Sequence, residues 1–149
     1  MRAIVQRVHA ARVEVNGKVV GEIQRGLCAF VGAGKDDNEA DMTYLIDKVI
    51  GLRIFPDSDG KMSRSVQDID GGILAISQFT VFGDVRRGRR PSFSNAMAPQ
   101  LARPAFAEFL KRLRQKHPHT ATGEFGANMR VLVDNDGPVS ILIDSSKTF

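Results

Sequence analysis

Short stretches of alternating or continuously apolar residues mark several strands in the first part of the chain. Residues 2–8 and 11–15 are predicted to form strands. Asn16-Gly17 lies between two alternating segments and favours a hairpin, because both turn positions need a positive φ. The continuous apolar run of residues 27–31 predicts a buried strand.

Helical spacing of apolar residues occurs in two places. The first helix is expected to begin after Asp37 or Asn38, since either side chain suits a helix cap. Its core-facing positions are Met42, Leu45, Ile46, Val49 and Ile50. The second helix is expected to begin at Pro104, because proline suits the first turn of a helix. Its apolar face consists of Phe106, Phe109, Leu110 and Leu113.

Further strands are predicted on both sides of the second helix. Residues 73–82 are apolar enough for a long strand, and a loop rich in arginine and glycine follows at 83–92. Two final strands are expected near 128–134 and 139–144, flanking the turn-forming residues 135–138. Strands therefore outnumber helices.

The organisation of the chain points to one domain. No linker, low-complexity tract or internal repeat divides its 149 residues, and a chain of this length buries roughly two-thirds of its unfolded surface. We therefore expect an α+β fold, with a single compact domain over residues 1–149. It should contain a mostly antiparallel, barrel-like sheet and two packed helices.

Composition narrows the possible environments and partners. The hydrophobic fraction of 42% and charged fraction of 26% are ordinary for a globular protein. No apolar run approaches the ~20 residues that span a bilayer, and the first residues lack the apolar core of a signal peptide. We expect a cytoplasmic protein without a membrane partner. The net charge of +4 favours a polyanionic partner, although similar charges occur in proteins that bind none.

Conventional side-chain catalysis finds little support. Cys28 is the only cysteine, which excludes an intramolecular disulfide and a thiolate zinc site, and its apolar neighbours favour an inert buried thiol. The spacings around His9, His117 and His119 fit no zinc pattern, so no metal and no cofactor is expected. Without a Gly-x-Ser-x-Gly motif, a Ser-His-Asp hydrolase is also unsupported.

Polar residues interrupt the apolar run of 73–82 at Ser77-Gln-Phe-Thr80. In one interpretation the strand simply leaves the core there and the polar side chains meet solvent. In the other, Thr80 offers a hydroxyl while successive backbone N–H groups form a small pocket that stabilises an anion. The residues alone leave both interpretations open.

Two further segments carry candidate chemistry. The simplest account of Asn135-Asp-Gly-Pro-Val-Ser140 is a hairpin turn. The Gly137-Pro138 bond can also adopt the cis form at a cost of only ~0.5–1 kcal/mol, which would direct nearby carbonyls toward a bound ammonium group. The segment 86–90 contains four arginines, which indicates either phosphate contact or a solvated loop. These are Arg86, Arg87, Arg89 and Arg90.

Taken together, the 77–80 and 135–140 segments resemble the two signature motifs of the D-aminoacyl-tRNA deacylase family, in the same order and at a similar separation. The resemblance covers essentially the whole chain. It continues through Gln6-Arg-Val8, Arg53-Ile-Phe55, Gly88-Arg-Arg-Pro-Ser-Phe93 and Gly123-Glu-Phe-Gly-Ala-Asn-Met129. Two positions differ: Ser140 stands where the family usually has threonine, and Phe82 stands where tyrosine is common.

This resemblance implies a homodimer in which the Gly137-Pro138 element of one subunit, with a cis bond, enters the active site of the other. It implies that the catalytic segment surrounds the scissile ester. That segment consists of Ser77, Gln78, Phe79 and Thr80. It also implies substrate-binding roles for Asn135, for Arg7, which braces the Gly-Pro element, and for Met129, which lines the pocket of the terminal adenosine.

The implied reaction is hydrolysis of the ester that joins a D-amino acid, or glycine mischarged on tRNA(Ala), to tRNA, with rejection of L-aminoacyl-tRNA. Backbone N–H groups of Phe79 and Thr80 would stabilise the oxyanion while the 2′-hydroxyl of the RNA assists. Thr80 as a covalent nucleophile is the alternative. The expected partner is tRNA and not DNA. Two rivals are a binding module that uses Arg86 to Arg90 without catalysis, and an esterase for small D-amino acid derivatives.

Overall fold

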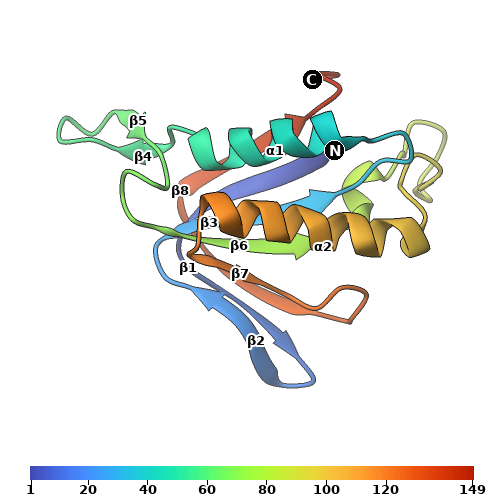
Figure 1. Cartoon of the computed structure of the whole chain (residues 1–149), viewed down its shortest axis with the longest axis horizontal. Coiled ribbons are helices and arrows are strands. Elements are labelled where there is room, and N and C mark those ends of the chain that lie inside the picture. The colour runs from blue at the N-terminus through green and yellow to red at the C-terminus, as the bar shows by residue number, and fades with distance from the viewer.

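The computed structural model describes residues 1–149 and places two helices across one face of a curved sheet (Figure 1). The helices are α1 (Glu39–Gly51) and α2 (Pro99–Lys116). The strands of the sheet are β1 (Arg2–Val15), β2 (Lys18–Ile23), β3 (Gly26–Gly32), β6 (Gly72–Ser77), β7 (Thr120–Thr122) and β8 (Arg130–Asp144). A separate hairpin consists of β4 (Phe55–Pro56) and β5 (Met62–Arg64), and the 3₁₀ helix η1 (Phe79–Phe82) follows β6.

Strand β1 organises the sheet. One edge of β1 pairs first with β3 and then with β2, and the other edge pairs with β8, all antiparallel. The remaining pairs, β3 with β6 and β6 with β7, are parallel. Across the open side, a Cβ added at Gly21 of β2 would lie 2.1 Å from the carbonyl oxygen of Thr122 in β7. Only glycine permits this approach, and it brings the sheet close to a closed barrel.

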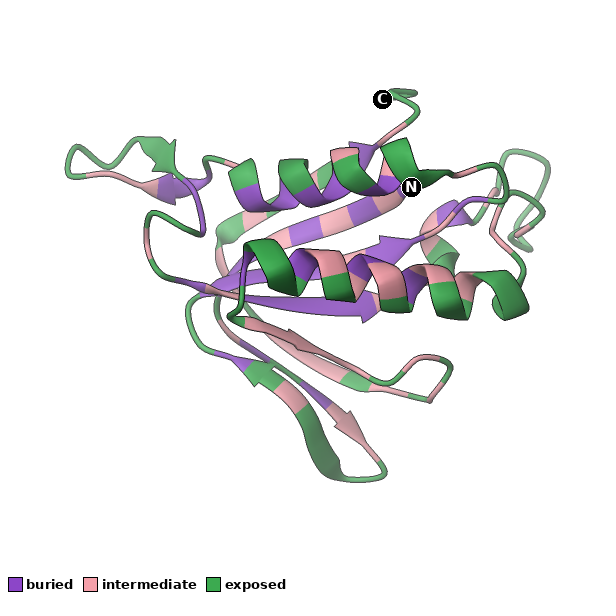
Figure 2. Cartoon of the chain, in the orientation of Figure 1, coloured by how far each residue is buried: buried purple, intermediate pink, exposed green.

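The expected α+β architecture, with a mostly antiparallel, barrel-like sheet and two helices, is therefore confirmed. The buried residues of both helices lie on the sides turned toward the sheet, and the residues on the opposite sides are mostly exposed (Figure 2). This helix side holds the larger core cluster, of 20 buried residues. A second cluster of seven lies on the opposite face of the sheet and includes Cys28, whose burial raises its pKa to about 12. No helix has the length and apolar character needed to cross a membrane.

The first helix follows its sequence pattern closely. Asn38 caps α1 by accepting a hydrogen bond from the Ala40 N–H (2.8 Å), and Asp41 accepts one from the Asn38 N–H (2.9 Å). The predicted apolar positions of this helix are all buried. The predicted start of α2 is wrong, because the helix begins at Pro99 and Pro104 lies inside it. Proline near a helix N-terminus removes few hydrogen bonds, so Pro99 takes the first position and Pro104 is tolerated.

Three strand predictions also need correction. Residues 2–8 and 11–15 form the single strand β1. The strand expected over 73–82 ends at Ser77, because the chain turns into η1, where the Val81 N–H bonds to the Gln78 carbonyl (3.4 Å). The two strands expected around 135–138 are one continuous strand, β8. The hairpin interpretation of this segment is wrong because β8 stays paired with β1 on both sides of it, through two register shifts.

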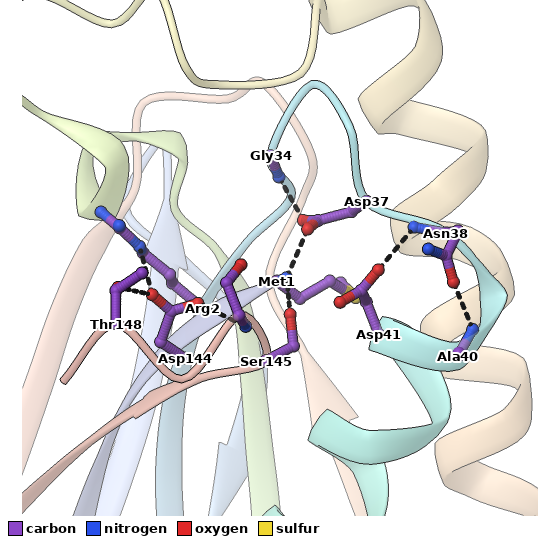
Figure 3. A network of polar contacts seen from close by, with 11 residues as sticks. Met1, Arg2, Gly34, Asp37, Asn38, Ala40, Asp41, Asp144, Ser145 and Thr148 are labelled. Carbon is purple, nitrogen blue, oxygen red and sulfur yellow. Dashed lines mark hydrogen bonds and ion pairs between the residues drawn. The ribbon is translucent and has the colours of Figure 1, made fainter.

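A polar network links the N-terminal residue to the segment before α1 and to the segment after β8 (Figure 3). The Met1 amine contacts Asp37 Oδ1 at 2.6 Å and donates to the Ser145 hydroxyl, while the Gly34 N–H donates to the other oxygen of Asp37. Close by, buried Asp144 pairs with Arg2 at 3.3 Å. Burial acts to raise the pKa of Asp144, but hydrogen bonds from Thr148 and Ser146 and the charge of Arg2 outweigh it and lower the pKa. The ends of the sheet and the start of α1 are thereby held together.

Candidate active site

A pocket of about 580 Å³ opens between the sheet and the first turns of α2. Its walls come from the ends of β3 and β6, from the loop before α2, from the α2 N-terminus and from residues around the start of β8. Fifteen of the 20 lining residues are hydrophobic, and no lining side chain is ionisable. A volume of this size suits a small organic ligand or one nucleoside.

Three members of the predicted catalytic segment, Ser77, Gln78 and Phe79, line this pocket, and exposed Thr80 follows at its edge. The segment is fixed to the sheet because the Gln78 N–H donates to the Val31 carbonyl at 2.8 Å. The Gln78 side-chain amide donates to the Thr80 hydroxyl, and the Thr80 carbonyl accepts a bond from the Gly83 N–H at 2.9 Å. The first N–H groups of a helix lack intrahelical acceptors, so η1 begins with such groups at Phe79, a residue that lines the pocket.

Aromatic rings line the pocket. Phe79 is 53% exposed and meets Phe93 edge to face, with ring centroids 4.9 Å apart. Phe106 and Phe125 line it as well, with centroids 6.2 Å apart, and so does the predicted residue Met129. Flat faces and a thioether favour a planar ligand such as a nucleobase.

The Gly137-Pro138 peptide bond is cis, and both residues are exposed on β8. Asn135 supports the segment by accepting a bond from the Val139 N–H (2.9 Å) and donating to the Ser140 hydroxyl (3.3 Å). Gln6 of β1 also donates to Ser140, at 3.0 Å. The Ser140 hydroxyl therefore accepts hydrogen bonds from two side chains of different strands.

Arg7 lies behind the same segment and is 9% exposed. Its Nη1 donates to the Ile54 carbonyl at 2.6 Å, and its Nε contacts both the Asp136 carbonyl (3.2 Å) and the Asp136 carboxylate (3.0 Å). His9 reaches the other carboxylate oxygen of Asp136 at 3.5 Å. The buried guanidinium thus fixes the residue that precedes Gly137.

The predicted site residues form two groups within one chain. The pocket holds Ser77, Gln78, Phe79 and Met129, with Thr80 adjacent to it. The second group, which does not line that pocket, consists of Arg7, Asn135, Gly137 and Pro138. A single chain therefore does not bring the Gly-Pro element to the 77–80 segment.

The arginine-rich loop forms a small polar hollow of its own. Asp84 and Ser92 close it through reciprocal backbone hydrogen bonds of 2.8 and 2.9 Å. A cavity of about 340 Å³ inside is lined only by polar residues and glycine. Its lining residues are Asp84, Arg86, Arg87, Gly88, Arg90, Ser92, Ser94 and Asn95, so Arg89 alone of the four arginines lies outside it. Hydrogen bonds from Arg86 hold the pKa of Asp84 well below its usual range.

The family model described as D-Tyr-tRNA(Tyr) deacylase matches residues 4–144. The chain belongs to this family. A D-aminoacyl-tRNA deacylase of Sorangium cellulosum is 59% identical over the full length of both chains. The solved structure of a c-Myc DNA unwinding element binding protein superposes with a TM-score of 0.93 and 38% identity, covering 97% of this chain and 98% of the other. A "probable eukaryotic D-amino acid tRNA deacylase" has the same fold, with a TM-score of 0.82, 15% identity and coverage of 95% and 97%.

Several residues of this family member's site were not predicted. Phe93, Phe106 and Phe125 line the pocket, yet Phe106 carries only the ordinary signal of a core-facing helix position. Asp136 and Ile54 hold Arg7 through groups that no sequence pattern distinguishes. The second departure, Phe82, is buried outside the pocket with the Arg2 guanidinium 4.7 Å from its ring centroid, so the missing phenol does not alter the pocket wall.

Proposed function

We propose that this protein hydrolyses the ester of D-aminoacyl-tRNA and releases the free D-amino acid and tRNA. The observation that carries the proposal is the position of the 77–80 segment beside an apolar, aromatic pocket. The pocket would hold the terminal adenosine, with Met129 against the nucleoside. The ester would then lie beside Phe79 and Thr80. Family membership supports the same reaction, and an enzyme of translation would act in the cytoplasm.

The absence of ionisable side chains from the pocket lining favours a mechanism that relies on backbone groups and on the RNA. An aminoacyl ester is already activated, so orientation and oxyanion stabilisation account for much of the required rate. The N–H groups of Phe79 and Thr80 would receive the developing negative charge. The 2′-hydroxyl of the terminal ribose would assist the attacking water.

Thr80 is disfavoured as a covalent nucleophile for a reason visible in its contacts. The side chain that bonds to its hydroxyl is the amide of Gln78, which donates a hydrogen bond and is not a base. A nucleophilic hydroxyl needs a neighbouring group that accepts its proton. We therefore assign Thr80 to orientation of water or of the ester.

Selection for D-amino acids would come from the Gly137-Pro138 element of a second copy. Its exposure, and its separation from the pocket of its own chain, support this arrangement. The edge of β8 that does not face β1 is free to pair with a second copy, which also supports this arrangement. Next to it lies an apolar face of the sheet, formed by Leu142, which is 62% exposed, by its β1 neighbour Ile4 and by Phe30 of β3. Carbonyls of Gly137 and Pro138 would fix the α-amino group, so that an L side chain meets backbone and is excluded.

Such a pocket has no means of rejecting glycine, which lacks a side chain, so glycine mischarged on tRNA(Ala) would also be hydrolysed. Outside the pocket, Arg86, Arg87, Arg89 and Arg90 would contact tRNA phosphates. The polar hollow that three of them line supports this role.

One assay tests the proposal. The protein is incubated with D-tyrosyl-tRNA, L-tyrosyl-tRNA and glycyl-tRNA(Ala), and ester loss is followed over time. We expect rapid loss of the D and glycyl esters and little loss of the L ester. Binding of tRNA without ester loss would instead favour a module without catalysis. Equal hydrolysis of D-tyrosyl methyl ester, which lacks RNA, would favour a small-molecule esterase.

A further inference from the structure

Arg103 stands out among the basic residues of α2 because it has no polar partner in the protein. Lys111 and Arg112 pair with Glu108, at 3.6 and 2.7 Å, and Lys116 pairs with Asp47 at 2.6 Å. Arg114 donates to the Thr120 carbonyl at 3.3 Å. The Arg103 guanidinium instead lies over the ring of Phe125, with its Cζ 4.8 Å from the ring centroid.

That contact puts Arg103 at the rim of the large pocket. Phe125 and Gly126 both line the pocket, and the Arg103 Nη2 lies 3.4 Å from the position that a Cβ on Gly126 would occupy. Arg103 also lies between Ala102 and Phe106 of α2, which both line the pocket. The cation–π contact with Phe125 positions the Arg103 guanidinium without using its N–H groups, so these groups stay available to a ligand.

The side chains that line the pocket are all uncharged, and the one charged group of a lining residue, the Met1 amine, is already paired with Asp37. A nucleoside bound inside would carry its 5′ phosphate outward, to the rim. A guanidinium with free N–H groups is suited to bidentate contact with a phosphate.

We infer that Arg103 binds the phosphate that joins the terminal adenosine of the substrate to the preceding nucleotide. The inference rests on the proposed function, because it requires a nucleoside in the pocket. It assigns to α2 a binding residue whose partner is the RNA backbone and not the amino acid. Arg103 would thereby help to distinguish aminoacyl-tRNA from free aminoacyl esters.

The test uses two minimal substrates, 3′-O-(D-tyrosyl)-adenosine with and without a 5′-phosphate. For the wild-type protein, KM should be about tenfold lower with the phosphate than without it. Arg103→Gln should remove this difference by raising KM for the phosphorylated compound alone, with kcat unchanged for both. Arg103→Lys, which keeps the charge without the planar fork, should retain part of the difference.

Arg114→Gln is the matched control, because it makes the same change in charge on the same helix, about 16 Å further along its axis. With intact D-tyrosyl-tRNA, Arg103→Gln should also reduce the slope of log KM against log salt by about 0.7, as expected for one lost contact to a single strand. Arg114→Gln should leave both readouts unchanged.

The outcomes separate this inference from the proposed function. No hydrolysis of either compound or of D-tyrosyl-tRNA by the wild-type protein would overturn the proposed function itself. Hydrolysis with a phosphate effect that survives Arg103→Gln would overturn only the role of Arg103. An equal rise in KM for both compounds would show that Arg103 merely supports the pocket wall through Phe125, which would also overturn the inference.

Discussion

Replacing Arg7 with methionine should cost about 2–3 kcal/mol of unfolding free energy. The variant keeps an unbranched apolar stem but leaves the buried carbonyl of Ile54 and the carboxylate of Asp136 without their donor. Loss of one partner from a buried pair typically costs about 3–5 kcal/mol. We take a lower value because the Asp136 side chain is 22% exposed and His9 lies beside it. The melting temperature should then fall by about 4–12 °C.

Urea unfolding of Arg7→Met, Asp136→Asn and the double variant measures the pair directly. The loss of unfolding free energy in the double variant should be smaller than the sum of the two single losses by about 1 kcal/mol or more, since the two groups contact each other. Arg12→Met on the same strand is the control. The exposed pair of Arg12 with Glu14 (3.0 Å) should contribute about 1 kcal/mol or less.

The same variant tests the functional role of Arg7. If Arg7 holds Asp136 so that Gly137-Pro138 is correctly placed, Arg7→Met should hydrolyse L-tyrosyl-tRNA faster relative to D-tyrosyl-tRNA than the wild type does. The ratio of the two initial rates is the measurement. If the losses of unfolding free energy are additive, the structural role of the Arg7–Asp136 pair is refuted. If the ratio of the L and D rates is also unchanged, the role of Arg7 in placing Gly137-Pro138 is refuted as well.

Three further outcomes follow from the structure. Thr80→Ala should slow hydrolysis of D-tyrosyl-tRNA by about 10–100-fold without abolishing it, and acid quenching should trap no acyl-enzyme in the wild type; a complete loss together with a trapped intermediate would restore Thr80 as nucleophile. Gly21→Ala should lower the melting temperature sharply, because the added methyl group would collide with the Thr122 carbonyl. As a control, Gly51→Ala in α1, with no atom within 4 Å of the added methyl group, should raise the unfolding free energy by about 0.5–1 kcal/mol. Equal melting temperatures of the two variants would contradict the close approach of β2 and β7. Because the folded pKa of Asp144 is lowered, its contribution to stability is present above the unfolded pKa of ~3.9 and is lost as pH falls through the lower folded value. Asp144→Asn should therefore flatten the pH dependence of urea unfolding below about pH 4, and an unchanged slope would exclude this role.

Local sequence signals predicted the elements that local interactions determine. The cap and the apolar spacing of α1 are complete within residues 38–50, so this helix was predicted correctly. The prediction of Pro104 as the start of α2 overlooked Pro99, which suits a first turn equally well and occupies it in the structure. Residues 79–82 are apolar enough for a strand, yet the chain turns there through hydrogen bonds of Gln78 and Thr80 that no periodicity reveals.

The site depends on contacts between residues far apart in the sequence, which limited its prediction. The motif segments were identifiable from their residue types and order, and the structure shows three of the four residues of 77–80 at the pocket. The continuity of β8 through Gly137-Pro138 depends on its pairing with β1, over a hundred residues away, so the local turn signal was misleading. For the same reason, Arg7 could be named from its motif, but its contacts with Ile54 and Asp136 could not.

The neutral lining of the large pocket has a consequence for how the protein could be inhibited. Reagents that acylate serine triads, alkylate reactive thiols or chelate metals find no matching group among the lining residues, and the single thiol is buried. An inhibitor would have to compete by shape, as a non-hydrolysable mimic of an acylated nucleoside. Resistance to such a mimic would require changes in the aromatic walls that, in the proposed function, would also receive the nucleoside of the substrate.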